Sequence, residues 1–167
     1  MNASVAIGQA SDLAEQTKEA LRRLAKAVVV ITARREGRRY AMAATAVSEL
    51  SMAPPSMLVC VNRSASIHRP LAAGADFCIN ILHCDQEAIS RACSGATRGE
   101  ARFALGAWGA IHGTPILLDA QASIVCKNEA RVSYGTHEVF LGPVTAVRLY
   151  GEVMPLVYLD GRYTRAM

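Results

Sequence analysis

Three short groups of polar residues, each set among apolar neighbours, are the parts of this 167-residue sequence that could do chemistry. Asn80 interrupts the apolar run 77–82, where a buried amide must find hydrogen-bond partners. Residues 62–66, Asn-Arg-Ser-Ala-Ser, follow another apolar run and offer two hydroxyls, an amide and a guanidinium. His137 stands in the sequence Gly-Thr-His-Glu, at the start of a predicted long strand. These groups are the candidate binding and catalytic residues.

The segment 62–66 has the residue types of a phosphate cradle. A turn that leads into a helix presents backbone N–H groups to an anion, and hydroxyls and an arginine add further donors. Each group also has a structural interpretation: Asn80 as a hydrogen-bonded core residue, 62–66 as the cap of the next helix, and His137 as a solvent-facing turn residue. The residue types alone leave both interpretations open.

Residues 41–50, Ala-Met-Ala-Ala-Thr-Ala-Val-Ser-Glu-Leu, form a stretch of mostly small side chains. Such a stretch lets a flat ligand approach the backbone closely, or simply allows tight packing. The sequence contains no P-loop, GxGxxG, GxSxG, HExxH or EF-hand motif, and it contains no carboxylate pair suited to acid–base work. If the protein is an enzyme, we therefore expect a cofactor to carry the reaction.

The composition is that of one globular domain, with 51% hydrophobic and 19% charged residues. We expect a loose arm over 1–10 and a single domain over 11–167. The net charge of +4 is concentrated in 34–39, which holds four arginines. This run is either a solvated hairpin tip or a patch that attracts an anionic substrate such as a dinucleotide. No basic face with interleaved aromatic residues is present, so we do not expect nucleic acid as a partner.

The cysteines and histidines argue against disulfides and metal sites. The five cysteines form no CxxC pair and the four histidines lack ligand spacing, which predicts reduced thiols, no bound metal and a cytoplasmic location. No apolar run is long enough to cross a bilayer, and the first residues do not have the pattern of a secretory signal.

Hydrophobic patterns predict a mainly β protein with a few helices, and this number of strands favours an antiparallel barrel. The first helix should open with a capping box at Asp12 and Glu15 and continue to about Val28. Gly142-Pro143 predicts a bulge or an edge position in the last long strand. The other elements that we expect are a hairpin turning at Gly37, strands within 28–32, 57–61, 77–82, 122–132 and 137–150, and short helices ending near Leu71 and over 85–93.

In their order along the chain, these segments resemble the motifs of the flavin reductase family, whose members use an FMN-binding split β-barrel. The resemblance covers about residues 17–165. Three positions differ from the family pattern: Ala41 replaces a frequent Gly, Ala43 a frequent Thr, and Thr136 a common Asp. The matching segments are 42–46 with Ser48, Ser51 and Pro54-Pro55, 61–66, 77–82 with Gln86, Arg102-Phe103, Trp108, 113–115, 135–137 with Gly142, and 155–158 with Tyr163.

The resemblance implies an NAD(P)H-dependent flavin reductase that transfers hydride from NADH or NADPH to FMN or FAD. It also implies a homodimer with shared sites and a separate monooxygenase that receives the reduced flavin. In this reading Asn80 braces the turn 62–66, and His137 is the catalytic residue that positions the nicotinamide. The implied cofactor-binding residues are Ala43, Ala44, Thr45, Ala46, Ser48, Asn62, Arg63, Ser64, Ser66 and Asn80.

Two other functions remain open from the sequence. The protein could keep its flavin bound and pass electrons to another acceptor, such as a cobalt corrinoid, in which case flavin should survive gel filtration. It could also be a flavin-binding module without turnover, which would leave the nicotinamide absorbance unchanged. The choices between FMN and FAD and between NADH and NADPH stay open as well.

Overall fold

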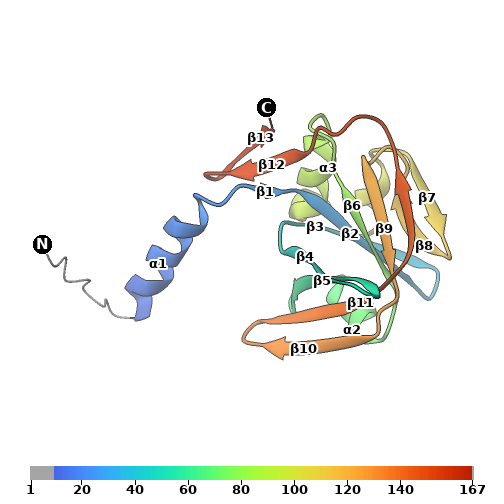
Figure 1. Ribbon diagram of the computed structural model, residues 1–167, viewed down its shortest axis with the longest axis horizontal. Helices are drawn as coiled ribbons and strands as arrows, with labels where there is room; N and C mark the ends of the chain where they lie inside the picture. Colours follow the sequence, from blue (N-terminus) through green and yellow to red (C-terminus); the bar gives the residue numbers. More distant parts are fainter. Residues whose placement is uncertain (1–9, 167) are drawn as a thin grey trace, which may run out of the picture.

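The computed structural model describes residues 10–166 and consists mainly of β-strands (Figure 1). Within these residues, no helix is long and apolar enough to cross a membrane. The helical elements are α1 (Ala10–Leu21), α2 (His68–Ala72), α3 (Glu87–Arg91), a π segment (Ala92–Ala96) and a 3-10 segment (Gly99–Phe103). The strands are β1 (Lys26–Ala27), β2 (Val29–Arg35), β3 (Arg38–Ala44), β4 (Val47–Met52), β5 (Pro55–Asn62), β6 (Phe77–Ile81), β7 (Trp108–Ile111), β8 (Thr114–Leu117), β9 (Ala122–Cys126), β10 (Ala130–Tyr134), β11 (His137–Leu149), β12 (Leu156–Leu159) and β13 (Arg162–Arg165).

The main sheet is a curved antiparallel sheet whose two edge strands are neighbours in the sequence. Its order is β3-β2-β6-β9-β11-β5-β4, with β10 added on β11. The edges β3 and β4 are joined only by Thr45 and Ala46. The sheet therefore curls toward closure without hydrogen bonds between its edges, and the small-residue segment bridges the open side.

Two apolar cores lie on opposite faces of this sheet. The alternation of a strand sends residues i and i+2 to one face, so β2 contributes Val29 and Ile31 to one core, while Val30 and the preceding residue, Val28, belong to the other. The first core fills the inside of the curved sheet around Phe77. The second packs beneath α3 and the segments that follow it, and a three-stranded sheet of β1, β12 and β13 lies nearby.

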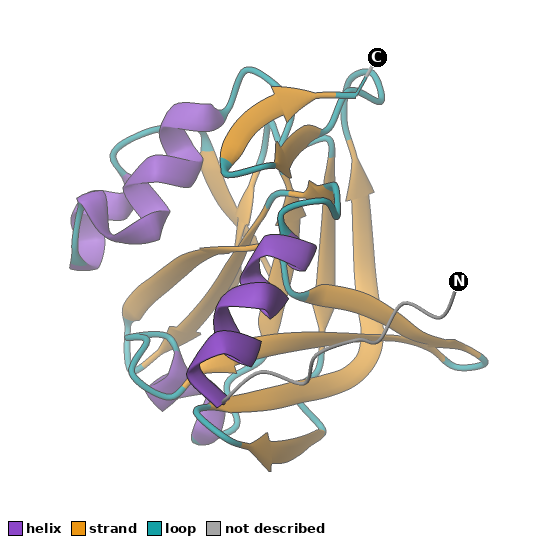
Figure 2. Cartoon of the chain, turned by 90° about the vertical axis from the view of Figure 1, so that its left-hand side faces the viewer, coloured by secondary structure: helices purple, strands orange, loops and turns teal. Residues whose placement is uncertain are grey.

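The first helix differs from its sequence prediction. α1 ends at Leu21 rather than near Val28, because Val28 is buried with the second core. Asp12 lies within the helix and accepts a hydrogen bond from the Gln16 side chain, so the expected capping box is wrong. Leu13, Leu21 and Leu24 are exposed; Figure 1 shows α1 lying away from the sheets, and in Figure 2 it lies in front of them. The expected loose arm falls almost entirely on residues 1–9, outside the described residues.

The predicted long strand over 122–132 is broken into β9 and β10. A Cβ at Gly142 would lie 1.7 Å from the carbonyl oxygen of Lys127, so the backbone of the break crosses β11 directly over this glycine. β11 pairs with β5, β9 and β10, so the edge position considered for Gly142-Pro143 is wrong. The expected bulge is present two residues further on, where the register with β9 shifts between Val144 and Ala146.

Candidate functional site

Residues 43–45, which we call the alanine wall, lie at the end of β3 and form one wall of a cavity of about 310 Å³. Ala43, Ala44 and Thr45 line it, and Ser90 and Tyr163 lie among the residues opposite. The Ser90 and Tyr163 hydroxyls are 2.9 Å apart and hold α3 against β13. Because the methyl groups of alanine are short, this wall leaves the backbone of β3 within reach of a flat ligand.

The turn 62–66 leaves the end of β5 and is held by bonds within itself. Asn62 Oδ1 accepts from the backbone N–H of Ser64 at 2.9 Å and from the Ser64 hydroxyl at 2.8 Å. The N–H of Ala65 donates to the Asn62 carbonyl, whereas the N–H of Ser66 has no acceptor within residues 10–166. The turn therefore presents a free N–H and exposed hydroxyls. It does not cap α2 with a side chain, because the N-cap is Ile67.

His137 lies directly beside this turn. It pairs in register with Asn62 across β11 and β5, and the N–H of Arg63 donates to the Thr136 carbonyl at 3.0 Å. The imidazole Nδ1 is 2.8 Å from the Thr136 hydroxyl. Thr136, which stands where the family commonly has Asp, thus supplies a neutral partner that orients the ring. The structure brings two of the three predicted polar groups together.

A second cavity of about 350 Å³ joins the turn to the beginning of β3. Arg102, which the sequence analysis gave no role, spans the gap: its guanidinium donates to the Ala41 carbonyl at 2.7 Å and to the Ser66 hydroxyl at 3.0 Å. The cavity is lined by Arg38, Arg39, Tyr40, Ala41, Ser66, Gly99, Glu100 and Arg102. Three guanidinium groups and one carboxylate give this cavity a net positive charge, which favours an anionic ligand.

Part of the arginine run 34–39 is a solvated hairpin tip, and part of it lies at a cavity where it can attract an anion. Arg34, Arg35 and Arg38 are exposed around a turn at Glu36-Gly37, as a solvated tip requires. Arg39 instead points back toward the body, where it pairs with Glu100 and lies 4.1 Å over the Phe103 ring. The signal that could have identified it is its position at the start of β3, two residues before the small-residue segment.

Asn80 does not reach the turn 62–66, so the predicted brace is wrong. It is fully buried, and its Nδ2 donates to the Val30 carbonyl at 2.9 Å. Its Oδ1 accepts from the Leu117 N–H at 2.8 Å and from the Ser123 hydroxyl at 3.0 Å. Asn80 therefore links β2, β8 and β9 through buried hydrogen bonds. Of the two roles considered from the sequence, it has the structural one, that of a hydrogen-bonded core residue.

Two further predicted residues lie outside both cavities. The Ser48 hydroxyl donates to the carbonyl of the next residue, Glu49. The side chain of Arg63 is exposed to solvent. The gathered part of the predicted site thus consists of Ala43–Thr45 at one cavity, Ser66 at the other, and Asn62, Ser64 and His137 beside the turn.

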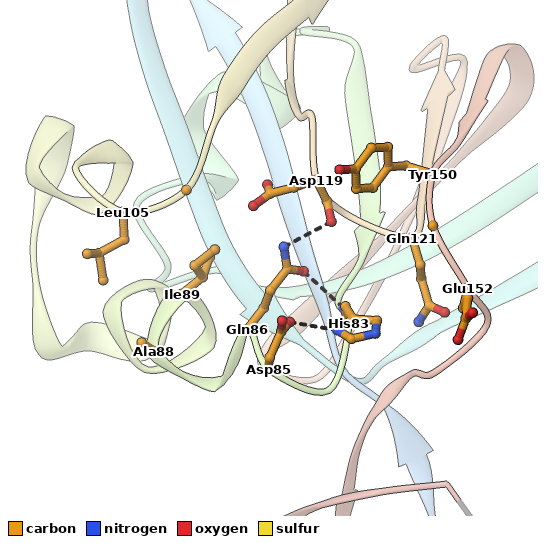
Figure 3. A pocket seen from close by; sticks show the side chains of 12 residues that line it. His83, Asp85, Gln86, Ala88, Ile89, Leu105, Asp119, Gln121, Tyr150 and Glu152 are labelled. Carbon is orange, nitrogen blue, oxygen red and sulfur yellow. Dashed lines mark hydrogen bonds and ion pairs between the residues drawn. The ribbon is translucent and has the colours of Figure 1, made fainter.

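A third cavity, of about 550 Å³, lies at the start of α3 and contains none of the predicted site residues (Figure 3). The Gln86 side chain lines this cavity. It accepts a hydrogen bond from the His83 N–H at 2.9 Å and donates one to the Asp119 carbonyl at 3.0 Å. Gln86, which belongs to the sequence resemblance, therefore holds two loops together in the structure.

The two cavities along β3 fit a flavin in shape and charge. The alanine wall can take the apolar ring, and the arginine-lined cavity with the Ser66 hydroxyl and N–H can take a phosphate. The described residues contain no group of three or more metal-ligating side chains that could hold an ion.

The family model described as "Flavin reductase like domain" matches residues 21–167. The reductase component of the FADH(2)-dependent resorcinol hydroxylase from a Rhizobium species is 40% identical over 149 residues, covering 87% of this chain and 83% of that protein. The NADH-dependent FMN reductase RutF of Methylorubrum populi is 39% identical over 147 residues, covering 87% of this chain and 73% of that protein.

Solved structures agree with these sequence relatives. Nitrilotriacetate monooxygenase component B from Mycobacterium thermoresistibile superimposes with a TM-score of 0.84 at 28% identity, covering 95% of this chain and 89% of that chain. The flavin reductase PheA2 superimposes with a TM-score of 0.83 at 26% identity, covering 92% and 97%. The predicted mainly β, split-barrel fold is confirmed.

Proposed function

Because the chain belongs to the flavin reductase family and is an NAD(P)H:flavin oxidoreductase, we propose that its flavin lies along β3, with the ring at Ala43–Ala46 and the phosphate at 62–66. The observation that carries this assignment is the Arg102 bridge. It places the Ser66 hydroxyl at the mouth of a positively charged cavity that begins where the alanine wall ends. FMN and FAD share the ring and the first phosphate, so both fit this arrangement.

At the ring side, the chain contributes backbone groups rather than charged side chains. Ala43 and Ala44 line the cavity together with Thr45, whose hydroxyl can donate to the ring, and Ala46 is exposed in the β3–β4 connection. Backbone N–H groups directed at the ring edge stabilise negative charge that develops there. A bound flavin supplies the hydride-accepting chemistry, which explains the absence of a protein nucleophile from this site.

At the phosphate side, the turn supplies donors that need no rearrangement. The Ser64 hydroxyl donates to Asn62, and this bond holds the turn in shape. The Ser66 hydroxyl accepts from Arg102 and so keeps its own proton for an anion. Arg63 and Ser48 are exposed and line neither cavity. We propose that they contact a part of the flavin that extends beyond the two cavities.

His137 is assigned to positioning the nicotinamide. It lies beside Asn62 at the end of β5, next to the turn that holds the flavin tail, and its Nδ1 is occupied by the Thr136 hydroxyl. Its Nε2 is therefore the nitrogen left for a ligand. We expect His137→Ala to raise the KM for the nicotinamide more than it raises the Kd for flavin. Steady-state kinetics and a flavin titration compare the two, and an unchanged KM contradicts the role.

We assign a homodimer to this protein because the chain leaves apolar faces uncovered. All described side chains of α1 are exposed, including Leu13 and Leu21, and β4 and β10 expose Leu50 and Tyr134. A second copy would bury these residues and would lie beside the open side of the sheet, at the proposed ring site.

We also infer the chemistry of the partners from the relatives. One relative is named as the reductase component of a resorcinol hydroxylase and a structural neighbour as component B of a monooxygenase, so we propose that reduced flavin is passed to a separate oxygenase. The RutF relative is named as an NADH enzyme, which favours NADH as donor. All five cysteines are free, which favours a reducing compartment, the cytoplasm.

One experiment tests the binding site and the turnover together. FMN is titrated into the protein and followed by quenching of flavin fluorescence, and NADH is then added while its absorbance is recorded. We expect saturable quenching and NADH oxidation only with flavin present. Quenching without NADH oxidation would indicate a binding module, and NADH oxidation independent of flavin would contradict the proposal.

A further inference from the structure

The turn 62–66 is attached on both sides of His137, the first residue of β11. Within the turn, the N–H of Arg63 donates to the Thr136 carbonyl at 3.0 Å. After the turn, the Nε2 of His68 lies 2.7 Å from Oε2 of Glu138. The two attachment points are therefore the residues that directly precede and follow His137: Thr136 just before β11, and Glu138 within it.

The second attachment is shielded from water. The side chains of His68 and Glu138 are 18% and 10% exposed. The other carboxylate oxygen of Glu138, Oε1, accepts from the Ser133 hydroxyl at 2.6 Å, and the Arg131 guanidinium lies 3.8 Å from Oε2. The His68 ring packs edge-on against Phe140, with ring centroids 5.7 Å apart.

These contacts keep the Glu138 carboxylate ionised. Hydrogen bonds from Ser133 and His68, together with the charge of Arg131, hold the pKa of Glu138 below its ordinary value. A hydrogen bond to an ionised carboxylate is stronger and shorter than one between neutral groups. The groups that face Glu138 are His68 from α2, Ser133 and Arg131 from β10, and Phe140 from β11 itself.

The start of α2 has few other side-chain ties. α2 has five residues, and its N-cap, Ile67, makes no capping hydrogen bond. The Asn62–Ser64 bonds stay within the turn, and Arg102 ties Ser66 to β3 rather than to β11. The bond between His68 and Glu138 is thus the side-chain contact that fixes the far end of the turn relative to His137.

We propose that His68 and Glu138 are a positioning pair that sets the distance between the turn 62–66, which holds the flavin phosphate, and His137, which faces the nicotinamide. This inference rests on the proposed flavin site. The pair touches neither ligand. It holds the far end of the turn at Glu138, while the Arg63 N–H holds the near end at the Thr136 carbonyl, so the turn stays aligned with His137 between them.

Two variants of His68 separate positioning from packing. His68→Phe keeps a ring against Phe140 but removes the N–H, and His68→Gln keeps an N–H for Glu138 but removes the ring. We expect His68→Phe to raise the Kd for FMN about tenfold, as for the loss of a hydrogen bond to a charged group, and to raise the KM for NADH. We expect His68→Gln to stay within about threefold of the wild type, and kcat at saturating ligands to be retained in both.

His83 provides the matched control. It forms a second His–carboxylate contact, 2.6 Å from Asp85, away from the turn. His83→Phe should leave both the FMN Kd and the NADH KM unchanged. If His68→Phe does not fold, as judged by circular dichroism, Glu138→Gln replaces it, because one amide oxygen cannot serve both His68 and Ser133 as two carboxylate oxygens do.

The outcomes distinguish this inference from the site on which it rests. If His68→Phe binds FMN as tightly as His83→Phe, or if His68→Gln loses as much as His68→Phe, the positioning pair is wrong. In that case, a loss of affinity in Ser66→Ala would show that the flavin site itself stands. If Ser66→Ala and His68→Phe both bind FMN normally, the assigned flavin site is wrong.

Discussion

A hydroxyl that already accepts a bond from a cation is a better donor to an anion, because successive hydrogen bonds polarise one another. Ser66 is in this position, since Arg102 donates to its Oγ from the cavity side. The same guanidinium donates to the Ala41 carbonyl, so one side chain both orients the proposed phosphate donor and joins it to β3. Among single residues, this bridge is the observation that favours the proposed phosphate-binding role of 62–66 over a role as a helix cap.

Ser66→Ala should weaken flavin binding by about 1–3 kcal/mol, because the phosphate would lose one partner and Arg102 would lose its acceptor. The measurement is the FMN Kd from fluorescence quenching. Ser56→Ala is the control: its hydroxyl donates to the Pro54 carbonyl in the β4–β5 hairpin, outside both cavities. Equal affinities for the two variants would move the phosphate away from Ser66.

Glu138 predicts a dependence of stability on pH. Its pKa is lowered in the folded protein by Ser133, His68 and Arg131. A carboxylate with a lowered folded pKa stabilises the fold above its unfolded pKa, and this contribution is lost as the pH falls through the folded value. We therefore expect urea unfolding to show a smaller loss of stability below about pH 4.5 in Glu138→Gln than in the wild type.

Asp160 provides a comparison for the acid measurement. Its pKa is also lowered, mainly by a hydrogen bond from Arg22, but both side chains are about half exposed. Solvent screens such a pair, so Asp160→Asn should change the acid dependence less than Glu138→Gln does. The opposite order would place the acid-sensitive contact at α1 and the β12–β13 turn.

At the scale of elements, the sequence predicted most strands and missed the reasons why some of them end. The apolar runs at 57–61 and 77–82 correspond to β5 and β6: β6 is buried on both faces, whereas β5 alternates buried Val59 and Val61 with partly buried residues. The break between β9 and β10 could not be predicted, since it depends on where the Lys127 backbone crosses Gly142. In the same way, Asn80 has a strong local signal, but its partners Val30, Leu117 and Ser123 are distant in sequence.

Gly142→Ala tests this crossing of backbones. The new methyl group would fall 1.7 Å from the Lys127 oxygen, so either the β9–β10 connection or β11 must shift. Overpacking of this kind costs about 3 kcal/mol. The free energy of unfolding in urea should fall by that amount. Gly113→Ala, at a turn glycine with open space around it but a φ of +80°, should lose only about 1 kcal/mol, the cost of the left-handed conformation. A small effect at Gly142 would mean that β11 can bend freely at this point.

In the whole molecule, the open side of the curved sheet and the uncovered apolar faces both favour association with a second copy of the chain. β3 and β4 are the sheet edges and lie at the alanine wall, while α1 extends from the other elements with its leucines in solvent (Figures 1 and 2). Exposed apolar area of this kind supports the proposed homodimer.

We expect analytical ultracentrifugation to give the mass of a dimer. If the proposed site is shared between subunits, Tyr134→Glu, on the exposed strand β10, should shift the protein toward monomer and weaken flavin binding together. Glu152→Gln, at an exposed position between β11 and β12, is the control and should do neither. A wild-type monomer with full flavin affinity would remove the shared-site argument.

The central claim is that the flavin lies along β3 with its phosphate at the turn 62–66. A crystal structure of the protein grown with excess FMN tests this claim most directly. We expect the flavin ring to lie against Ala43–Ala46, with a phosphate oxygen within hydrogen-bonding distance of the Ser66 hydroxyl. A ring bound elsewhere, or a phosphate with no contact to residues 62–66, would contradict it.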